Sequence, residues 1–154
     1  MKPWNPNIRV QGEPFDAAHE SQRLTAGRSE IGALVTFTGL CRDEGGQLAA
    51  LELEHFPGMA EKEIARIAGQ AMERWPLMGL TIIHRTGRIA PGEPIVLVVT
   101  ASAHRKAAFE AAEFLMDYLK TKAPFWKKEH YKEGASGGWV DARSADDDAA
   151  DRWS

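Results

Sequence analysis

Residues 94–121, PIVLVVTASAHRKAAFEAAEFLMDYLKT, decide the fold class because a strand pattern passes directly into a helix pattern. The run at 94–102 is almost wholly apolar and rich in β-branched residues, which predicts a central strand. The helix should run from His104 to Thr121 and end before Pro124, since proline cannot continue a helix. The positions expected to face the core, at helical spacing, are Ala108, Ala111, Ala112, Leu115 and Leu119.

Strand and helix patterns also alternate on the N-terminal side of this unit. The segment IGALVTFTG (31–39) is apolar and β-branched and predicts a buried strand. In LAALELEHF (48–56), alternation places Leu51 and Leu53 on one face of a strand. Further strands are expected at 8–11 and 80–87, and helices at 16–27 and 59–75. This order predicts an α+β fold rather than a parallel doubly wound sheet, and neither a repeat nor a long linker divides the single domain 1–154.

Charge is distributed unevenly along the C-terminal part. The net charge of the chain is -3, and the last fourteen residues account for it with five aspartates against two arginines. Four lysines at 120–128 are therefore a local feature, and a nucleic-acid-binding protein would show a broader basic surplus. FWKKEHY (125–131) predicts an edge strand, WVDA (139–142) a short extended segment, and the acidic tail 144–154 a fraying end.

Composition places the chain among ordinary globular proteins, with 44% hydrophobic and 27% charged residues. The N-terminus has no apolar signal segment, and the longest apolar run, 95–101, is far too short to span a membrane. We therefore expect a cytoplasmic protein without membrane contact. The single cysteine, Cys41, excludes an internal disulfide and is typical of a small, inert, buried side chain.

The start of the helix at 104–121 is the first candidate anion site. With Ser102 as the predicted N-cap, His104 and Arg105 lie in the first turn, where free N–H groups and the helix dipole favour an anion. Basic side chains at this end suggest that a phosphate or carboxylate binds there. An ordinary surface ion pair for Arg105 is about equally compatible with the pattern.

The lysines at the other end of this helix form the second candidate site. Lys120 lies in its last turn, and Lys127 follows the change of direction at Pro124. If Phe125 and Trp126 are anchored in the core, the two ammonium groups can converge on one cleft. Crowded ammonium groups lose proton affinity, and a neutral lysine is a base or a nucleophile. The alternative is a solvated, lysine-rich helix end that complements the dipole.

Other motifs, present or absent, limit the classes of enzyme to which the chain could belong. Arg42 follows a predicted strand, in a position where loops often carry function. The histidines lack metal-binding spacing, so no metal is expected, and the motifs GxSxG, GxGxxG and the P-loop are absent from the sequence. These absences disfavour serine hydrolases, dinucleotide-binding enzymes and P-loop nucleotide hydrolases.

Six blocks of the sequence, taken together and in order, resemble the catalytic (large) subunit of molybdopterin synthase. The blocks are VTFTGLCRD, LELEHFPGMAEKEI, RWPLMGLTIIHRTGRIAPGE, TASAHRKAAFEA, MDYLKTKAPFWKKE and WVDAR, and the likeness covers residues 8 to 143. The resemblance implies an α/β-hammerhead fold with an additional antiparallel β-sheet, in a homodimer. Each large subunit would bind a small ubiquitin-like sulfur carrier, which gives a heterotetramer.

The reaction implied by this resemblance is a sulfur transfer in molybdenum cofactor biosynthesis. Two sulfurs pass from the carrier's C-terminal Gly-Gly thiocarboxylate to cyclic pyranopterin monophosphate and form molybdopterin. No metal and no cofactor are required for this step. The sulfur arrives on the partner, so the Cys41 thiol need not participate.

The resemblance also implies a set of site residues. Lys120 and Lys127 are expected to be catalytic, because they would hold the thiocarboxylate and the tetrahedral intermediates. Arg42, His104 and Arg105 would hold the phosphate, and the histidine and Arg105 would serve a pocket whose lysines come from the other protomer. The full substrate-binding set is Leu40, Cys41, Arg42, His104, Arg105, Lys120, Lys127, Lys128 and Glu129.

Two other functions fit parts of the pattern. A non-catalytic module would capture an anionic peptide tail or a phosphorylated ligand in the same cleft. RNA binding through the lysines and the aromatic residues Phe125 and Trp126 agrees less well with the balanced charge of residues 1–140 and with the burial expected for both rings.

Overall fold

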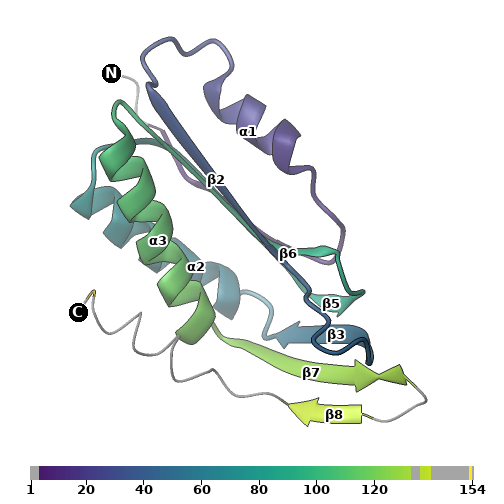
Figure 1. The fold of residues 1–154 in the computed structure, drawn as a ribbon. Helices are drawn as coiled ribbons and strands as arrows, with labels where there is room; N and C mark the ends of the chain where they lie inside the picture. Colours follow the sequence, from purple (N-terminus) through teal and green to yellow (C-terminus); the bar gives the residue numbers. More distant parts are fainter. Residues whose placement is uncertain (1–3, 133–135, 140–152, 154) are drawn as a thin grey trace.

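The computed structural model describes residues 4–132, 136–139 and 153. In this part of the chain, three helices accompany two four-stranded sheets (Figure 1). The helices are α1 (Ala17–Thr25), α2 (Met59–Arg74) and α3 (Arg105–Thr121). The strands are β1 (Asn7–Gln11), β2 (Ala33–Leu40), β3 (Leu48–His55), β4 (Leu77–Arg85), β5 (Gly87–Ile89), β6 (Pro94–Ser102), β7 (Phe125–Tyr131) and β8 (Ser136–Trp139).

The first sheet has the strand order β1-β4-β6-β2 and is covered by helices on both faces. On one face, Val96 and Val98 of β6 pack in a core with residues of α2 and α3. On the other face, Leu97 and Val99 pack with Leu24 of α1 and its neighbours. The strand at 94–102 is therefore continuously apolar because both of its faces are buried, and its predicted bounds are confirmed.

The second sheet is antiparallel, with the order β5-β3-β7-β8, and lies at one end of the first (Figure 1). Its own small core contains Cys41, Leu48, Leu53 and Ile89. The prediction of an edge strand at 125–131 is wrong, because β8 pairs with the outer side of β7. Of the predicted segment 139–142, only residue 139 is described, and it ends β8.

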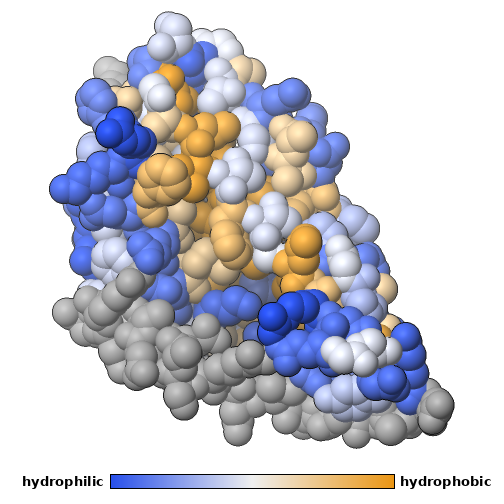
Figure 2. Space-filling view, viewed as in Figure 1, coloured by the Kyte–Doolittle hydropathy of each residue, from blue (hydrophilic) through white to orange (hydrophobic). Residues whose placement is uncertain are grey.

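The strand predicted to be buried at 31–39 is in fact half-exposed. It forms β2, the outer strand of the first sheet, and none of its residues is fully buried. Leu34, Phe37 and Leu40 are exposed by 38%, 40% and 56%. Figure 2 shows this apolar surface on the face of the molecule that carries β2 and α3.

Ser102 belongs to β6, although the sequence predicted it as the N-cap of the following helix. Ser102 pairs with Ala33 and Leu77 as the last residue of β6, and its hydroxyl donates to the carbonyl of Pro76 at 2.8 Å. It is therefore not the N-cap of α3, and that prediction is wrong. The N-cap is His104, whose side chain makes no capping hydrogen bond.

No helix among the described residues is long and apolar enough to cross a membrane.

Most of the tail expected to fray, residues 144–152 and 154, lies outside the described residues. The indole of Trp153 packs edge-on against Trp75 and Phe114.

Candidate active site

A cavity of about 270 Å³ lies where the two sheets meet the C-terminal end of α3. Its walls come from β2, β3, β4, β6, α3 and β7, so both sheets contribute to it. The cavity is lined by Gly39, Leu40, Leu51, His84, Ile95, Val96, Met116, Leu119, Lys120, Thr121, Ala123, Phe125, Trp126 and Lys127. Most of these residues are apolar, and the polar side chains of the lining are those of His84, Lys120, Thr121 and Lys127.

Lys120 and Lys127 supply the cationic side chains of this lining. The helix α3 ends at Thr121, and the N–H group of Lys122 donates to the Tyr118 carbonyl at 2.7 Å as the C-cap. The chain then reverses at Pro124, and β7 begins at Phe125. Lys120 is an exposed residue and Lys127 is half-buried.

The ring of Phe125 fixes the start of β7 against the first sheet. It stacks on the imidazole of His84 in β4, with ring centroids 3.8 Å apart and an angle of 11° between the planes. Since alternate residues of a strand face the same way, Lys127 lies on the same face of β7 as Phe125. This contact between the two sheets therefore carries Lys127 into the cavity.

Trp126 does not enter the core as expected. It is 43% exposed and meets Phe56 edge-on, with ring centroids 5.0 Å apart. Alternation along β7 explains this, because neighbours of Phe125 in the strand face the other way. The argument against RNA binding consequently rests on charge balance rather than on two buried rings.

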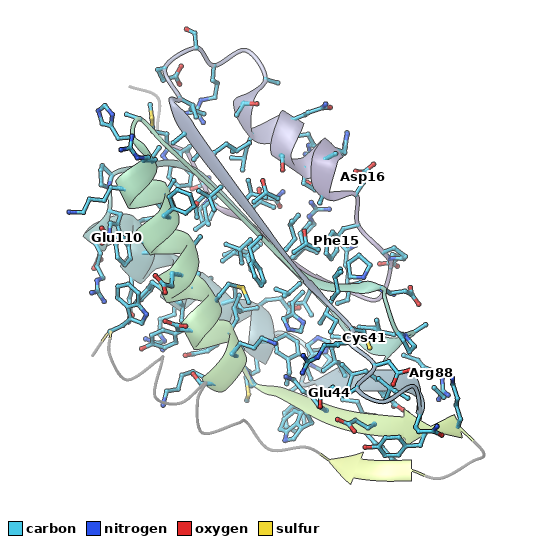
Figure 3. The ribbon with its side chains drawn as sticks, viewed as in Figure 1. Phe15, Asp16, Cys41, Glu44, Arg88 and Glu110 are labelled. Atoms are coloured by element: carbon cyan, nitrogen blue, oxygen red, sulfur yellow. The ribbon has the colours of Figure 1, made fainter. Side chains whose placement is uncertain are left out.

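The three side chains of the segment Leu40–Arg42 lie in different environments. Leu40 is exposed and lines the cavity. Cys41 is buried in the core of the second sheet, and its backbone N–H and carbonyl pair with Glu93 and Gly92. Arg42 is exposed and forms an ion pair with Glu44. Figure 3 shows Glu44 in the segment that follows β2.

The Cys41 thiol is held in its protonated form. Burial raises its pKa, and the negative charges of Asp43, Glu93 and Glu129 raise the pKa further. A protonated, enclosed thiol is a poor nucleophile. This environment agrees with the inert role expected from the sequence.

His104 and Arg105 lie at the opposite end of α3 from the lysines. Both side chains are exposed, and the first turn of α3 contains no acidic residue. Fifteen helical positions separate Arg105 from Lys120, which corresponds to roughly 22 Å along the helix axis. One copy of this chain therefore does not bring the two predicted sites together.

Lys128 and Glu129 continue β7 beyond the cavity. Lys128 is opposite Glu52 in β3, and its positive charge contributes to the lowered pKa of that carboxyl, after the hydrogen bond from His130. Glu129 accepts a hydrogen bond from the Tyr131 hydroxyl, which raises the pKa of the phenol. Both residues are half-buried and engaged within the second sheet.

His84 is a titratable residue of the cavity that the sequence did not single out as a site residue. Its place in LTIIHR gave one hint, because strand alternation puts it on the same face as Ile82, toward α3. Its partner Phe125 could not be identified without the fold. Within the described part of the chain, no group of His, Cys, Asp and Glu side chains is arranged to hold a metal ion.

Comparison with known proteins gives consistent matches along the chain. The model of the family described as "MoaE protein" matches residues 10–122. Molybdopterin synthase catalytic subunits of Mesorhizobium japonicum and Pseudomonas aeruginosa are 66% and 53% identical to it over 148 residues each. These alignments cover 96% and 95% of this chain and 93% and 97% of the relatives.

Solved structures agree with the sequence matches and with the predicted α+β fold. The molybdopterin biosynthesis MoaE protein from Burkholderia ambifaria matches with a TM-score of 0.82 and 50% identity, over 96% of this chain and 97% of that one. Molybdopterin synthase from Staphylococcus aureus matches with a TM-score of 0.76 and 33% identity, over 85% and 94% of the two chains. The chain therefore belongs to the MoaE protein family.

Proposed function

We propose that this chain is the catalytic subunit of molybdopterin synthase. It transfers two sulfurs from the C-terminal thiocarboxylate of a small ubiquitin-like partner to cyclic pyranopterin monophosphate. Similarity to catalytic subunits over 96% of the chain supports this function. The observation that carries the mechanism is the presence of Lys120 and Lys127 in one cavity.

The charges of the reactants explain why such a cavity needs two cations. The thiocarboxylate and the phosphate are both anionic, and two like charges 4 Å apart repel by roughly 4 kcal/mol at an effective dielectric constant of 20. Two ammonium groups offset this repulsion. They also stabilise the charge that develops on oxygen or sulfur during the reaction, where preorganised donors act most strongly.

Each transfer forms a carbon–sulfur bond on the pterin in place of a carbon–oxygen bond, whose oxygen leaves as water or stays on the phosphate when the cyclic ester opens. The carbon–sulfur bond of the tail then breaks. Water supplies the oxygen to the acyl carbon, so the tail leaves as a carboxylate. Lys127 holds the thiocarboxylate and its tetrahedral adducts from the half-buried side of the cavity. Lys120, the exposed residue of the two, is the first candidate for proton transfer or for a transient covalent bond.

The phosphate site requires a second protomer. Arg105 and His104 lie too far along α3 to reach the cavity of their own chain, so a homodimer would bring them to the lysines of its partner. The exposed apolar side chains on the outer strand β2 and Phe109, exposed by 60% on α3, support such an interface. Two small subunits then complete a heterotetramer, which we place in the cytoplasm.

A reconstituted reaction tests the proposed function. The purified chain, the thiocarboxylated small subunit and cyclic pyranopterin monophosphate are incubated, and the products are identified by mass spectrometry. We expect a pterin that carries two new sulfurs. Tight calorimetric binding of either reactant without sulfur incorporation would instead support a non-catalytic module.

A further inference from the structure

His84 occupies the inner wall of the cavity between the two sheets. Only 6% of the residue is exposed, and one face of its ring is covered by Phe125. It nevertheless lines the same cavity as Lys120 and Lys127. A polar ring at this depth is costly unless both of its nitrogens find partners.

The Nδ1 atom has such a partner, 2.9 Å away, in the backbone carbonyl of Arg85. Because a carbonyl oxygen only accepts, Nδ1 must carry a proton and donate it. Burial lowers the pKa of His84 to about 4, against the raising effect of that hydrogen bond, and the charges of Lys127, Lys120 and His55 lower it further. At neutral pH the ring is therefore neutral, and Nε2 presents a lone pair.

No described residue donates a hydrogen bond to Nε2. Within the described part of the chain, the fully enclosed side-chain nitrogens and oxygens that lack a hydrogen-bond partner belong to Arg9, and His84 is not among them. Since His84 also lines the cavity, we infer that Nε2 is accessible from it. The other polar groups of the lining are mainly donors. Lys120 and Lys127 have no acceptor capacity, so the acceptors of the lining side chains are His84 Nε2 and the Thr121 hydroxyl, whose proton goes to the Asp117 carbonyl at 2.8 Å.

We propose that His84 is a further reactant-binding residue of this site, and that its Nε2 accepts a hydrogen bond from an N–H group of a bound reactant. The inference rests on the proposed function and assigns this role to a residue outside the cationic set. A neutral acceptor suits the cavity because it orients a donor without cancelling the lysine charges. A carboxylate in its place would neutralise the field that attracts the anionic reactants.

Two sources can supply the N–H group. One is the pterin ring system of the precursor, and the other is the peptide backbone of the Gly-Gly tail. Both offer an N–H donor to Nε2. Separate titrations with the precursor and with the small subunit distinguish the two sources.

Two substitutions of His84 test the acceptor atom Nε2 separately from the rest of the side chain. His84→Asn keeps an N–H that reaches the Arg85 carbonyl but has no atom at the position of Nε2, whereas His84→Gln places its amide oxygen near that position. We expect His84→Asn to raise the KM for one reactant by about 5- to 150-fold, because a buried donor loses its partner. His84→Gln should recover most of this loss.

Equal effects of the two substitutions, or a normal KM in His84→Asn, would overturn the proposal. His19→Asn is the matched control, since His19 is an exposed histidine on α1. Thermal unfolding establishes that each variant is folded before its kinetics are compared.

A second measurement needs neither turnover nor a variant. The ¹⁵N resonance of His84 Nε2 is followed in the wild-type chain while the precursor alone, or the small subunit alone, is added. The reactant that supplies the N–H should shift this resonance to the position of a hydrogen-bonded, unprotonated nitrogen. If both bind without shifting it, the proposal is wrong, whereas a shift without any sulfur transfer would contradict the proposed function alone.

Discussion

The imidazole of His84 lies flat on the ring of Phe125, with centroids 3.8 Å apart, and this contact joins β4 of one sheet to β7 of the other. Phe125 also approaches His55 of β3, with a centroid distance of 5.9 Å. Lys127 follows two residues later on the same face of β7. The placement of a proposed catalytic cation therefore depends on a buried, neutral histidine.

The buried histidine makes the stability of the fold sensitive to mild acid. The pKa of His84 is about 4 in the folded chain, compared with 6.5 for an unperturbed histidine, so the unfolded chain binds the proton first as the pH falls. The free energy of unfolding should decrease by up to about 3 kcal/mol between pH 6.5 and pH 4 on account of this group. Above pH 6.5 the effect should vanish.

Thermal unfolding of the wild type and of His84→Gln across this pH range measures the contribution of His84. The glutamine variant should lose less stability on acidification, since its side chain does not titrate. A matched His19→Gln variant should follow the wild type, because His19 is exposed. Parallel curves for all three proteins would show that His84 does not titrate low.

The thiol of Cys41 should react slowly with alkylating reagents in the folded chain. Burial and three nearby carboxylates raise its pKa, so little thiolate is present at neutral pH, and the core of the second sheet encloses it. Mass spectrometry after timed alkylation, with a sample in denaturant as the control, gives the two rates. Alkylation of the native chain as fast as the denatured one would contradict this environment.

The separation between Arg105 and Lys120 makes a composite site testable by mixing variants. Arg105→Ala and Lys120→Ala homodimers should each be nearly inactive. A mixed dimer contains one site with neither substitution, so random mixing should restore about a quarter of the wild-type activity.

The control for this experiment is a mixture of Lys120→Ala with Lys127→Ala. Both substitutions lie in the cavity lining of one chain, so every site of their mixed dimer stays damaged. Recovery in this control, or no recovery in the first mixture, would contradict a site that is shared in the proposed way.

The strand at 94–102 and the helix after it were predictable because each carries its own periodicity over many residues. The wrong predictions share one cause. The burial of a strand and its position in a sheet depend on residues that are distant from it in the sequence. The burial of 31–39 failed because β2 has a sheet neighbour on one side only within the described residues, and the edge position of 125–131 failed because β8 covers it.

The residues of the candidate site were also predictable only in part. Lys120 and Lys127 were accessible to sequence reasoning because a short, proline-bounded segment connects them. The role proposed for His84 could not be predicted from the sequence. Its burial, its stacking partner and its low pKa all arise from the packing of β4 against β7. The separation between Arg105 and the lysines was predictable, because the expected helix 104–121 already places them at opposite ends, and α3 confirms it.

A three-variant comparison tests the central role of the cavity lysines most directly. Lys120→Ala, Lys127→Ala and, as control, Lys122→Ala are each supplied with thiocarboxylated small subunit and precursor, and molybdopterin is quantified by mass spectrometry. The two cavity variants should lose about 100- to 1000-fold in rate, while Lys122→Ala, exposed at the C-cap of α3, should remain close to the wild type. Near-normal product from both Lys120→Ala and Lys127→Ala would contradict the account.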